Sequence, residues 1–352
     1  MKKRTKIMAM MTAMTITVSQ LGTNGVVSYA QQDQESTSYE TMLTVLQENG
    51  YTETAAESLG TEIETVYESI LAGETVDVET SVMEVDNLTE IEEFLSSDEK
   101  ELTKMGFSDK EIKSATEEVE EMLSMDNEEL SESYGLDNTE IKMLRTAEEN
   151  AEERNSLEDG SESKKIGNRV KASGSISSSE MTYTQTVINR STASKPKYDV
   201  TLSYQWSTPY WLTSFNDKIA VAWGGGFNTT STNYTAQAWY YDWNVTSTKW
   251  KSTLCAVDNM SYTDTPNRGI IFSLKQGYGV TPDVKTAKTK KGHAKFTIFQ
   301  TKKKGYSTKI ISNYCHRTVA LTGVSLAVDG SPRITIGGAW DATAQKATNV
   351  IY

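Results

Sequence analysis

The sequence has little of what most metal and catalytic sites are made of. Its 352 residues include two histidines, His293 and His316, and two cysteines, Cys255 and Cys315. No ligand spacing joins these residues and no calcium-binding loop pattern occurs, so neither a metal nor another cofactor is predicted. The glycine runs at 224–226 and 337–338 do not continue into a phosphate-binding loop. They fit bulges or tight turns at strand ends instead.

Carboxylates are scarce in the second half of the chain, where an enzyme of the glycosidase type would need a pair of them. From residue 166 onward there are one glutamate, Glu180, and eight aspartates. A pair built from Asp199, Asp217 or Asp341 would suit glycan hydrolysis, but no spacing points to it. A glycan-active hydrolase is therefore the third choice, and no catalytic residue is predicted.

Long apolar runs are also missing, apart from a short one at the start. A basic head (Lys2, Lys3, Arg4, Lys6) precedes a Met/Ala/Ile-rich stretch that ends in the small residues Ser28 and Ala30. This order predicts a secretory signal peptide over residues 1–30, cleaved near Ala30. Threonines and other polar residues interrupt the ~18 apolar residues that a membrane anchor needs. The mature protein is expected to be secreted.

Export decides how the two cysteines are interpreted. Outside the cell an even number of cysteines favours disulfide pairing, so Cys255 and Cys315 are predicted to form a disulfide. Such a bond would contribute about 4 kcal/mol in the chain-entropy description. Two buried thiols are the alternative.

The charges are divided between two halves of the chain. Residues 31–165 hold 39 acidic and 9 basic residues, whereas residues 166–352 hold 9 acidic and 22 basic residues. All seven tryptophans and all five prolines lie in the basic half. The predicted organisation is an acidic helical domain at 31–151, a charged linker at 152–167 and a basic β domain at 168–352.

Helical spacing of apolar residues marks the acidic half. Stripes at 63–71, 88–95, 112–122 and 141–151 predict short amphipathic helices. Three joints repeat a glycine, an apolar residue and a capping residue (Thr52, Ser108 and Asp137), and the last two complete capping boxes with Glu111 and Glu140. The joint "KMGFSDKEI" resembles the Met-Gly-Phe loop of ubiquitin-associated domains. Helix ends alone explain all three joints.

The basic half is predicted to be all β. Short runs rich in Val, Ile, Thr, Tyr and Trp occur at 199–206, 218–223, 234–243, 268–276, 293–301, 307–314, 318–328 and 333–338. No helical stripe lies between them, so the fold class is α+β, with a C-terminal antiparallel β-sandwich beside an N-terminal bundle of short helices.

Eight lysines and no acid occupy residues 285–305. The pattern predicts a strand with lysine-rich turns at Gly292 and near Gly305, and an exposed His293. Lysines at a sheet edge guard against aggregation, but the acidic half suggests a second role, contact with that half in cis or with a polyanion. The candidate contact residues are Lys288, Lys290, Lys291, Lys302, Lys303 and Lys304.

Aromatic residues are frequent in the β half and about half of the tryptophans are expected to be buried. Trp211, Tyr240 and Trp243 lie in turn-rich stretches and are predicted to be exposed, where they would contact a glycan or a membrane.

These observations favour a secreted, non-enzymatic protein whose basic β domain binds an anionic or glycan-bearing cell-envelope surface. The acidic half would act as a cis cover or as a propeptide. The expected partners are that half itself and an anionic wall polymer, a glycan or an anionic membrane, and no nucleic acid. The alternative is a membrane-acting toxin or bacteriocin, for which the Ser/Thr-rich stretch at 173–194 would be a membrane hairpin or a solvated edge strand.

Overall fold

The computed structural model describes residues 29–104, 106–134, 136–156, 178–229, 234–244, 249–265, 268–278, 287–317, 324–329, 331–336 and 340–352. The chain divides into two compact units, residues 1–41 and residues 42–352. The predicted signal peptide falls almost entirely outside the described ranges. Within those ranges no helix combines the length and the apolar character needed to cross a membrane.

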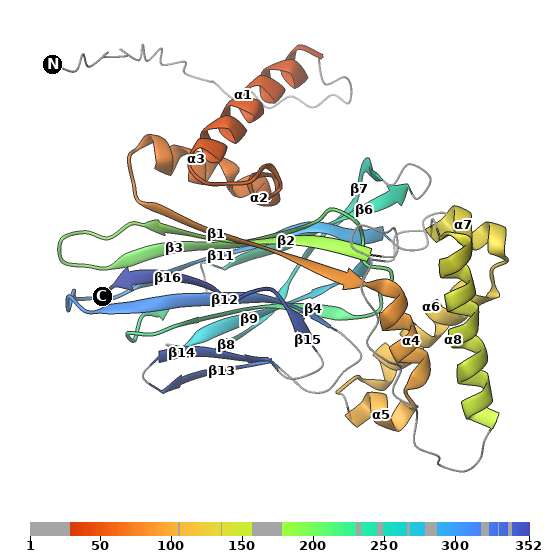
Figure 1. Ribbon diagram of the computed structural model, residues 1–352. Coiled ribbons are helices and arrows are strands. Elements are labelled where there is room, and N and C mark those ends of the chain that lie inside the picture. The colour runs from red at the N-terminus through yellow and green to blue at the C-terminus, as the bar shows by residue number, and fades with distance from the viewer. Residues whose placement is uncertain are drawn as a thin grey trace, which may run out of the picture. The chain divides into compact units, whose positions relative to one another are not determined.

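Helices occupy the N-terminal part of the chain and strands the C-terminal part, as predicted (Figure 1). The helices are α1 (Tyr29–Glu48), α2 (Glu53–Ser58), the 3-10 helix η1 (Gly60–Glu62), α3 (Ile63–Leu71), α4 (Asn87–Ser96), α5 (Glu99–Lys104), α6 (Asp109–Ser124), α7 (Asn127–Tyr134) and α8 (Asn138–Ser156). The strands are β1 (Val76–Asp86), β2 (Ser178–Asn189), β3 (Lys197–Trp206), β4 (Asn216–Trp223), β5 (Asn228–Thr229), β6 (Thr235–Asn244), β7 (Lys249–Asn259), β8 (Ser261–Thr265), β9 (Gly269–Lys275), β10 (Gly277–Tyr278), β11 (Ala287–Phe299), β12 (Ser307–Arg317), β13 (Val324–Asp329), β14 (Ser331–Ile336), β15 (Trp340–Ala342) and β16 (Lys346–Ile351).

The predicted helix ends form as the sequence indicates. The Thr52 side chain accepts a hydrogen bond from the Ala55 amide at the start of α2. Ser108 and Glu111 make a reciprocal capping box at α6. Gly50 and Gly106 adopt positive φ angles of 96° and 82°, which a residue with a Cβ rarely adopts. These short-range signals determine where the helices begin.

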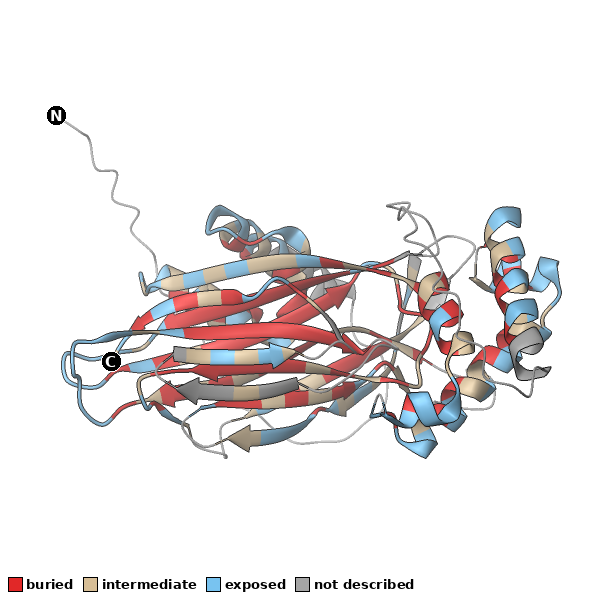
Figure 2. Cartoon of the chain, turned by 60° about the horizontal axis from the view of Figure 1, so that its bottom comes forward, coloured by how far each residue is buried: buried red, intermediate tan, exposed pale blue. Residues whose placement is uncertain are grey.

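Antiparallel strand pairs build two large sheets. Sheet A has the order β1-β2-β3-β11-β6-β7, and β5 and β10 also pair with β11. Sheet B has the order β15-β12-β4-β9-β8, and β16 also pairs with β12. Strands β13 and β14 form a separate two-stranded sheet. Figure 2 shows the buried residues, in red, along the strands of the two large sheets.

One large core joins sheet A, sheet B and helices α4–α8. Tyr204 of sheet A and Tyr314 of sheet B are both fully buried, with ring centroids 5.1 Å apart. Phe107, just before α6, packs on Phe215, just before β4, at 4.9 Å. Residues of α4, α6 and α8 belong to the same cluster, so these helices are packed on the sheets rather than tethered to them.

Strand β1 was not predicted, although Val76, Val78 and Val82 alternate with polar residues. It lies in the acidic half but pairs with β2 along its whole length, from Val76 opposite Ile188 to Asp86 opposite Ser178. The predicted linker at 152–167 lies mostly outside the described residues, and its first five residues belong to α8. Residues 42–352 form one compact unit.

The interpretation of the Ser/Thr-rich stretch as an edge strand or membrane hairpin is wrong for its described part. β2 lies between β1 and β3 in sheet A. Its polar side chains are buried because they find partners inside the protein. Gln185 donates to Thr348 Oγ1 at 2.9 Å and accepts from Ser312 Oγ at 2.7 Å, which joins sheet A to sheet B.

Candidate functional site

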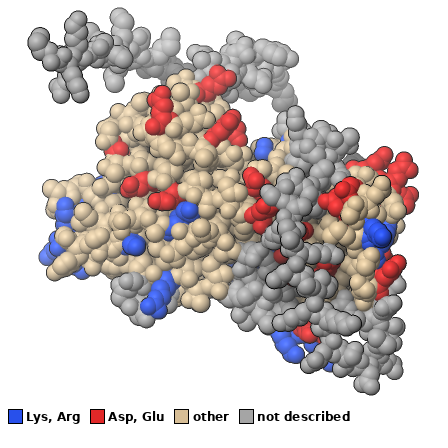
Figure 3. All heavy atoms as spheres, in the orientation of Figure 1, with Lys and Arg blue, Asp and Glu red and all other residues tan. Residues whose placement is uncertain are grey.

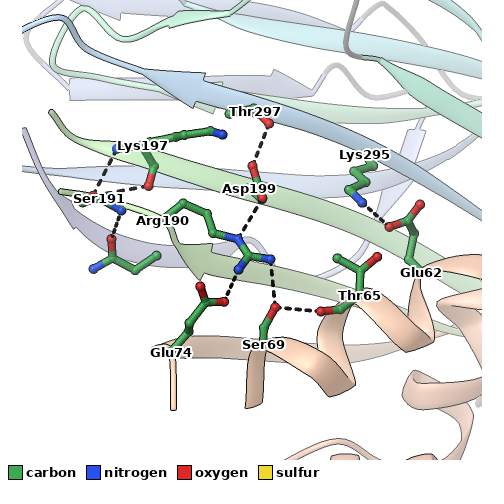
Figure 4. A network of polar contacts seen from close by, with 11 residues as sticks. Glu62, Thr65, Ser69, Glu74, Arg190, Ser191, Lys197, Asp199, Lys295 and Thr297 are labelled. Carbon is green, nitrogen blue, oxygen red and sulfur yellow. Dashed lines mark hydrogen bonds and ion pairs between the residues drawn. The ribbon is translucent and has the colours of Figure 1, made fainter. Parts of the chain in front are cut away.

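Basic side chains gather on the face of sheet A that residues 51–74 cover. Lys291, His293 and Lys295 alternate along β11 and therefore point to the same side. Arg190, just after β2, lies on the same side (Figure 4). We call these four residues the basic face, and we call residues 51–74, which include α2, η1 and α3, the cover.

Ion pairs hold the second half of the cover on the basic face (Figure 4). Glu62 pairs with Lys295, and Glu74 pairs with Arg190. Arg190 also donates to Ser69 Oγ at 2.9 Å and, from Nε, to Asp199 Oδ2 at 3.1 Å. Asp199 in turn accepts from Thr297 Oγ1 at 2.7 Å, so the network continues into β11.

The first half of the cover is held by neutral and charge-assisted hydrogen bonds. The Ser58 and Ser203 hydroxyls lie 2.7 Å apart and both side chains are buried. Glu57 accepts from Gln205 through its carboxylate at 2.8 Å and from Lys291 through its backbone carbonyl at 3.2 Å. Helices α4–α8 differ from the cover in that they contribute residues to the large core.

His293 lies at the centre of the covered face and has no exposed surface. Neither ring nitrogen finds a hydrogen-bond partner among the described residues, and Glu62 Oε1 is 3.9 Å away. The ring packs on Trp239, with centroids 5.1 Å apart. Burial, together with the charges of Lys295 and Lys291, lowers the pKa of His293 to about 4 against the opposing effect of Glu62. At neutral pH the imidazole is uncharged.

A second feature is a cleft of about 560 Å³ lined by residues of both sheets and of the α5–α6 joint. Its walls come from the α5–α6 joint, β4, β6, the β7–β8 connection, β9 and the end of β12. The lining is mainly polar, with Asn216, Lys218, Asn259, Lys275 and Arg317 among its side chains. Lys275 and Asn259 are exposed, so the cleft is open to solvent.

Charges in the cleft are concentrated on the sheet B side. Burial and the neighbouring Arg317 lower the pKa of Lys218, whereas Glu111 acts in the opposite direction. The Arg317 guanidinium lies over the Phe107 ring, 4.2 Å from its centroid, and the Arg317 amide donates to Asp217 Oδ1 at 3.0 Å. The Arg317 guanidinium is therefore packed against the α5–α6 joint.

Beside the cleft lies a closed polar cluster around Asp217. Its Oδ2 accepts from the Tyr314 hydroxyl at 2.6 Å, contacts His316 Nδ1 at 2.9 Å and accepts from Gln276. Asp217 and His316 have no exposed surface. A substrate does not reach these groups in this conformation, so the cluster holds β4, β9 and β12 together rather than forming an open active site.

The other carboxylates considered for glycan hydrolysis do not join Asp217 in one site. Asp199 is in β3 of sheet A, where Arg190 and Thr297 use its oxygens. Asp217 is in β4 of sheet B, and Asp341 is in β15, paired with His316 in the ladder. The Asp341 side chain lies outside the described residues.

The predicted lysine contacts lie in two places: Lys288, Lys290 and Lys291 in β11, and Lys302, Lys303 and Lys304 in the loop before β12. Lys291 touches the cover, and Lys288 donates to the carbonyls of Tyr210 and Trp211 at 3.2 and 3.0 Å, with burial lowering its pKa to about 8. Lys290 lies over the Tyr241 ring at 5.2 Å. Lys302, Lys303 and Lys304 are exposed in the loop before β12, and Lys304 lies 5.6 Å from the Tyr352 ring centroid.

The predicted turn at Gly292 is wrong, because β11 continues through it from Ala287 to Phe299. A Cβ at Gly292 would lie 2.6 Å from the Gln237 carbonyl oxygen and from the Tyr204 ring. Glycine is thus required here by close packing and not by a turn. His293, the next residue of the same strand, was predicted to be exposed in that turn. It is buried because β11 continues through this point. Gly305 lies in the loop between β11 and β12 and has a φ angle of 77°.

Two of the three aromatic residues predicted to be exposed are buried. Trp211 is 5% exposed and Tyr240 is 1% exposed. The Trp211 ring packs on Tyr134 of α7 at 5.4 Å, and the Tyr240 hydroxyl donates to the Lys275 carbonyl at 3.1 Å. The side chain of Trp243 lies outside the described residues. Helix α7 covers Trp211, and sheet B covers Tyr240. The alternation along one strand predicts neither contact.

The predicted disulfide between Cys255 and Cys315 does not form. Cys255, in β7 of sheet A, packs against the large core. Cys315, in β12 of sheet B, points to the opposite face of that sheet, where it packs with Ala220 in a separate cluster. A disulfide requires Cα atoms within ~7 Å and Cβ atoms that point toward each other. An even number of cysteines suggests pairing, but it does not predict where each thiol lies in the fold. Here Cys255 packs against the large core and Cys315 packs in the separate cluster.

Sequence reasoning missed most of the residues that build these features. Arg190, Glu57, Glu62 and Glu74 were part of the overall charge count but were not selected. The alternation of Lys291, His293 and Lys295 is the one local signal that predicts a shared face. The partners that cover it are far away in the sequence.

No protein family and no curated protein matches this sequence. Among solved structures, the collagen-binding domain of the Erysipelothrix rhusiopathiae surface protein RspB matches with 9% identity and a TM-score of 0.23. The match covers 48% of this chain and 65% of that chain, slightly less than two thirds of its length. Similarity at this level supports no inference about the fold or the ligand.

Proposed function

We propose that this is a secreted, non-enzymatic binding protein whose sandwich-like β part binds an anionic cell-envelope polymer through the basic face. In this proposal the cover, from the acidic half, occupies the same face in cis. The supporting observation is the character of the contact: the cover presents the carboxylates of Glu62 and Glu74 to Lys295 and Arg190 and a backbone carbonyl to Lys291.

Charge placement supports the same proposal. On the side of the molecule drawn in Figure 3, acidic side chains gather over the helices, whereas most basic side chains lie over the strands. An ionic contact is exchanged for another anion at less cost than an apolar core contact, because a polyanion restores the lost ion pairs. The cover would therefore compete with the polymer for the basic face.

The test compares the mature chain with a variant whose cover is weakened. The double variant Glu62→Gln/Glu74→Gln removes both ion pairs and should bind a poly(glycerol phosphate) polymer several-fold more tightly than the unaltered chain. The matched control Glu99→Gln/Glu117→Gln removes the same charge at exposed positions on α5 and α6, where ion pairs contribute little. Binding is measured by isothermal titration at two salt concentrations.

Equal affinities for the double variant and its control would refute the cover. No polymer binding by any of the three proteins would refute the proposed ligand. Leakage of anionic vesicles without polymer binding would instead favour the membrane-acting alternative.

A further inference from the structure

The cleft beside the α5–α6 joint has the dimensions and lining of a small-ligand site, separate from the basic face. Its volume of about 560 Å³ lies within the range of pockets that hold small molecules. Its lining is richer in amide, hydroxyl and charged groups than such pockets usually are. An apolar ligand would leave these groups without water or partners, so the lining favours a polar ligand.

The cationic side of the cleft is arranged for an anionic group. Lys218 of β4 lies next to Arg317 at the end of β12, because Cys315 pairs with Lys218 in the ladder. Arg317 is fixed by the Phe107 ring and by Asp217. Two like charges held near each other in a partly buried site disfavour each other's charged state, and an anion placed between them removes that penalty.

Glu111 and Asp217 oppose this cationic pair, yet burial still lowers the pKa of Lys218 and of Arg317. The Glu111 carboxylate also accepts hydrogen bonds from the Ser108 amide at 2.9 Å and hydroxyl at 2.8 Å, and from Asn216 Nδ2 at 3.2 Å. These contacts fix Glu111 as the cap of α6 and orient the Asn216 side chain at the cleft wall. The cleft thus combines two neighbouring cations with a positioned amide.

Groups suited to hydroxyls lie beside the cations. Ser273 of β9 pairs with Lys218, and Ser261 of β8 pairs with Ser273, so the three side chains share one face of sheet B. Asp258 and Asn259 line the cleft from the end of β7. Carboxylate, amide and hydroxyl side chains accept from and donate to sugar hydroxyls. Tyr240, the aromatic residue of the lining, is 1% exposed and offers little ring surface for stacking a nucleobase.

We propose that the cleft binds one anionic sugar unit, with its carboxylate or phosphate between Lys218 and Arg317 and its hydroxyls toward Asn259 and Ser261. A carboxylated and a phosphorylated sugar share this chemistry, an anion on a polyhydroxyl ring. The site lies outside the basic face and does not depend on the cover.

The experiment titrates the mature chain with glucuronate, glucose 6-phosphate, glucose and inorganic phosphate. We expect saturable binding of at least one of the two anionic sugars and at least about tenfold weaker binding of glucose, since the charged hydrogen bonds are lost. Stronger binding of glucuronate identifies a carboxylate ligand, and stronger binding of glucose 6-phosphate identifies a phosphate ligand.

Variants locate the binding. Lys218→Met should weaken the preferred anionic sugar about tenfold or more, whereas the control Lys309→Met, at an exposed lysine of β12 outside the cleft lining, should leave affinity unchanged. Because Lys218 is partly buried, Asn259→Ala at the exposed rim provides a second variant that is less able to disturb folding. It should weaken the sugar but not inorganic phosphate.

The proposal is overturned if neither anionic sugar binds. It is also overturned if Lys218→Met and Asn259→Ala both bind the preferred anionic sugar as the unaltered chain does, or if inorganic phosphate binds as tightly as the sugars. Binding that is unchanged in Glu62→Gln/Glu74→Gln separates this site from the basic face. The cleft and the polymer proposal can therefore fail independently.

Discussion

His293 shows how much one buried side chain can depend on its surroundings. It faces Glu62 of the cover, Lys291 and Lys295 of its own strand and the ring of Trp239 from β6. In the folded protein it is neutral, because burial lowers its pKa to about 4. In an unfolded chain its pKa returns to ~6.5. In mild acid, the histidine must therefore lose its proton when the chain folds, which lowers the free energy of unfolding.

This difference gives a prediction for stability against pH. The contribution of His293 is fully present above pH ~6.5 and is lost as the pH falls toward 4, by about 3 kcal/mol in total for a single site. In His293→Gln the free energy of unfolding should change less between pH 7 and pH 4.5, since glutamine does not titrate. Urea unfolding of both proteins at each pH measures the difference.

The carboxylates titrate in both proteins, so the comparison isolates the histidine. Equal pH dependence in the two proteins would contradict a neutral, buried His293. Hydrogen exchange of residues 51–74 at the two pH values would show whether acid loosens the cover locally.

At the scale of elements, β1 joins the acidic half to sheet A. It covers the edge of β2 and buries Met83 and Val85, which are 7% and 1% exposed. Without β1, the backbone groups of β2 would form an unpaired edge strand, which promotes self-association. Burial of the two side chains contributes roughly 1.5–3 kcal/mol each.

Two truncated chains test the role of this strand. A chain that begins at residue 75 lacks the cover but keeps β1, and a chain that begins at residue 86 lacks both but keeps the Asp86 cap of α4. We expect the shorter chain to melt at a lower temperature and to self-associate, as measured by calorimetry and light scattering. If the two chains behave alike, β1 does not protect the sheet.

At the scale of the whole molecule, the acidic half is bound to the β part by three kinds of contact. β1 pairs with β2, the cover makes ion pairs with the basic face, and α4–α8 share the large core. Salt screens the ion pairs, with a Debye length of ~3 Å at 1 M, but it does not weaken the other two contacts in the same way. The halves should therefore stay together when the chain between them is cut.

Limited trypsin digestion tests this expectation, because Lys164 and Lys165 lie in the sequence predicted to be a linker. We expect early cleavage there, followed by co-elution of the two fragments on size exclusion in 0.1 M and in 1 M salt. They should separate only in denaturant. Fragments that separate in native buffer would indicate two independent domains on a tether, and first cleavage at Lys302–Lys304 would contradict the predicted linker.

The sequence by itself determined the features that depend on neighbours a few residues apart. The helical stripes became α3, α4, α6 and α8, and the capping residues Ser108 and Asp137 bind the groups predicted for them. The helical N-terminal part and the β-rich C-terminal part were also predictable, since a period of 3.6 or of 2 is a local property.

Only the tertiary structure decided which surface each side chain meets. The pattern of β11 shows that Lys291, His293 and Lys295 share a face, but not that the cover buries it. Trp211, Tyr240 and the two cysteines were misjudged for the same reason, because α7 and the packing of two sheets determine their surroundings. Pairing β1 with β2 brings together residues about a hundred positions apart. Local periodicity carries no information about such partners, since they are selected by the combined packing of the whole chain.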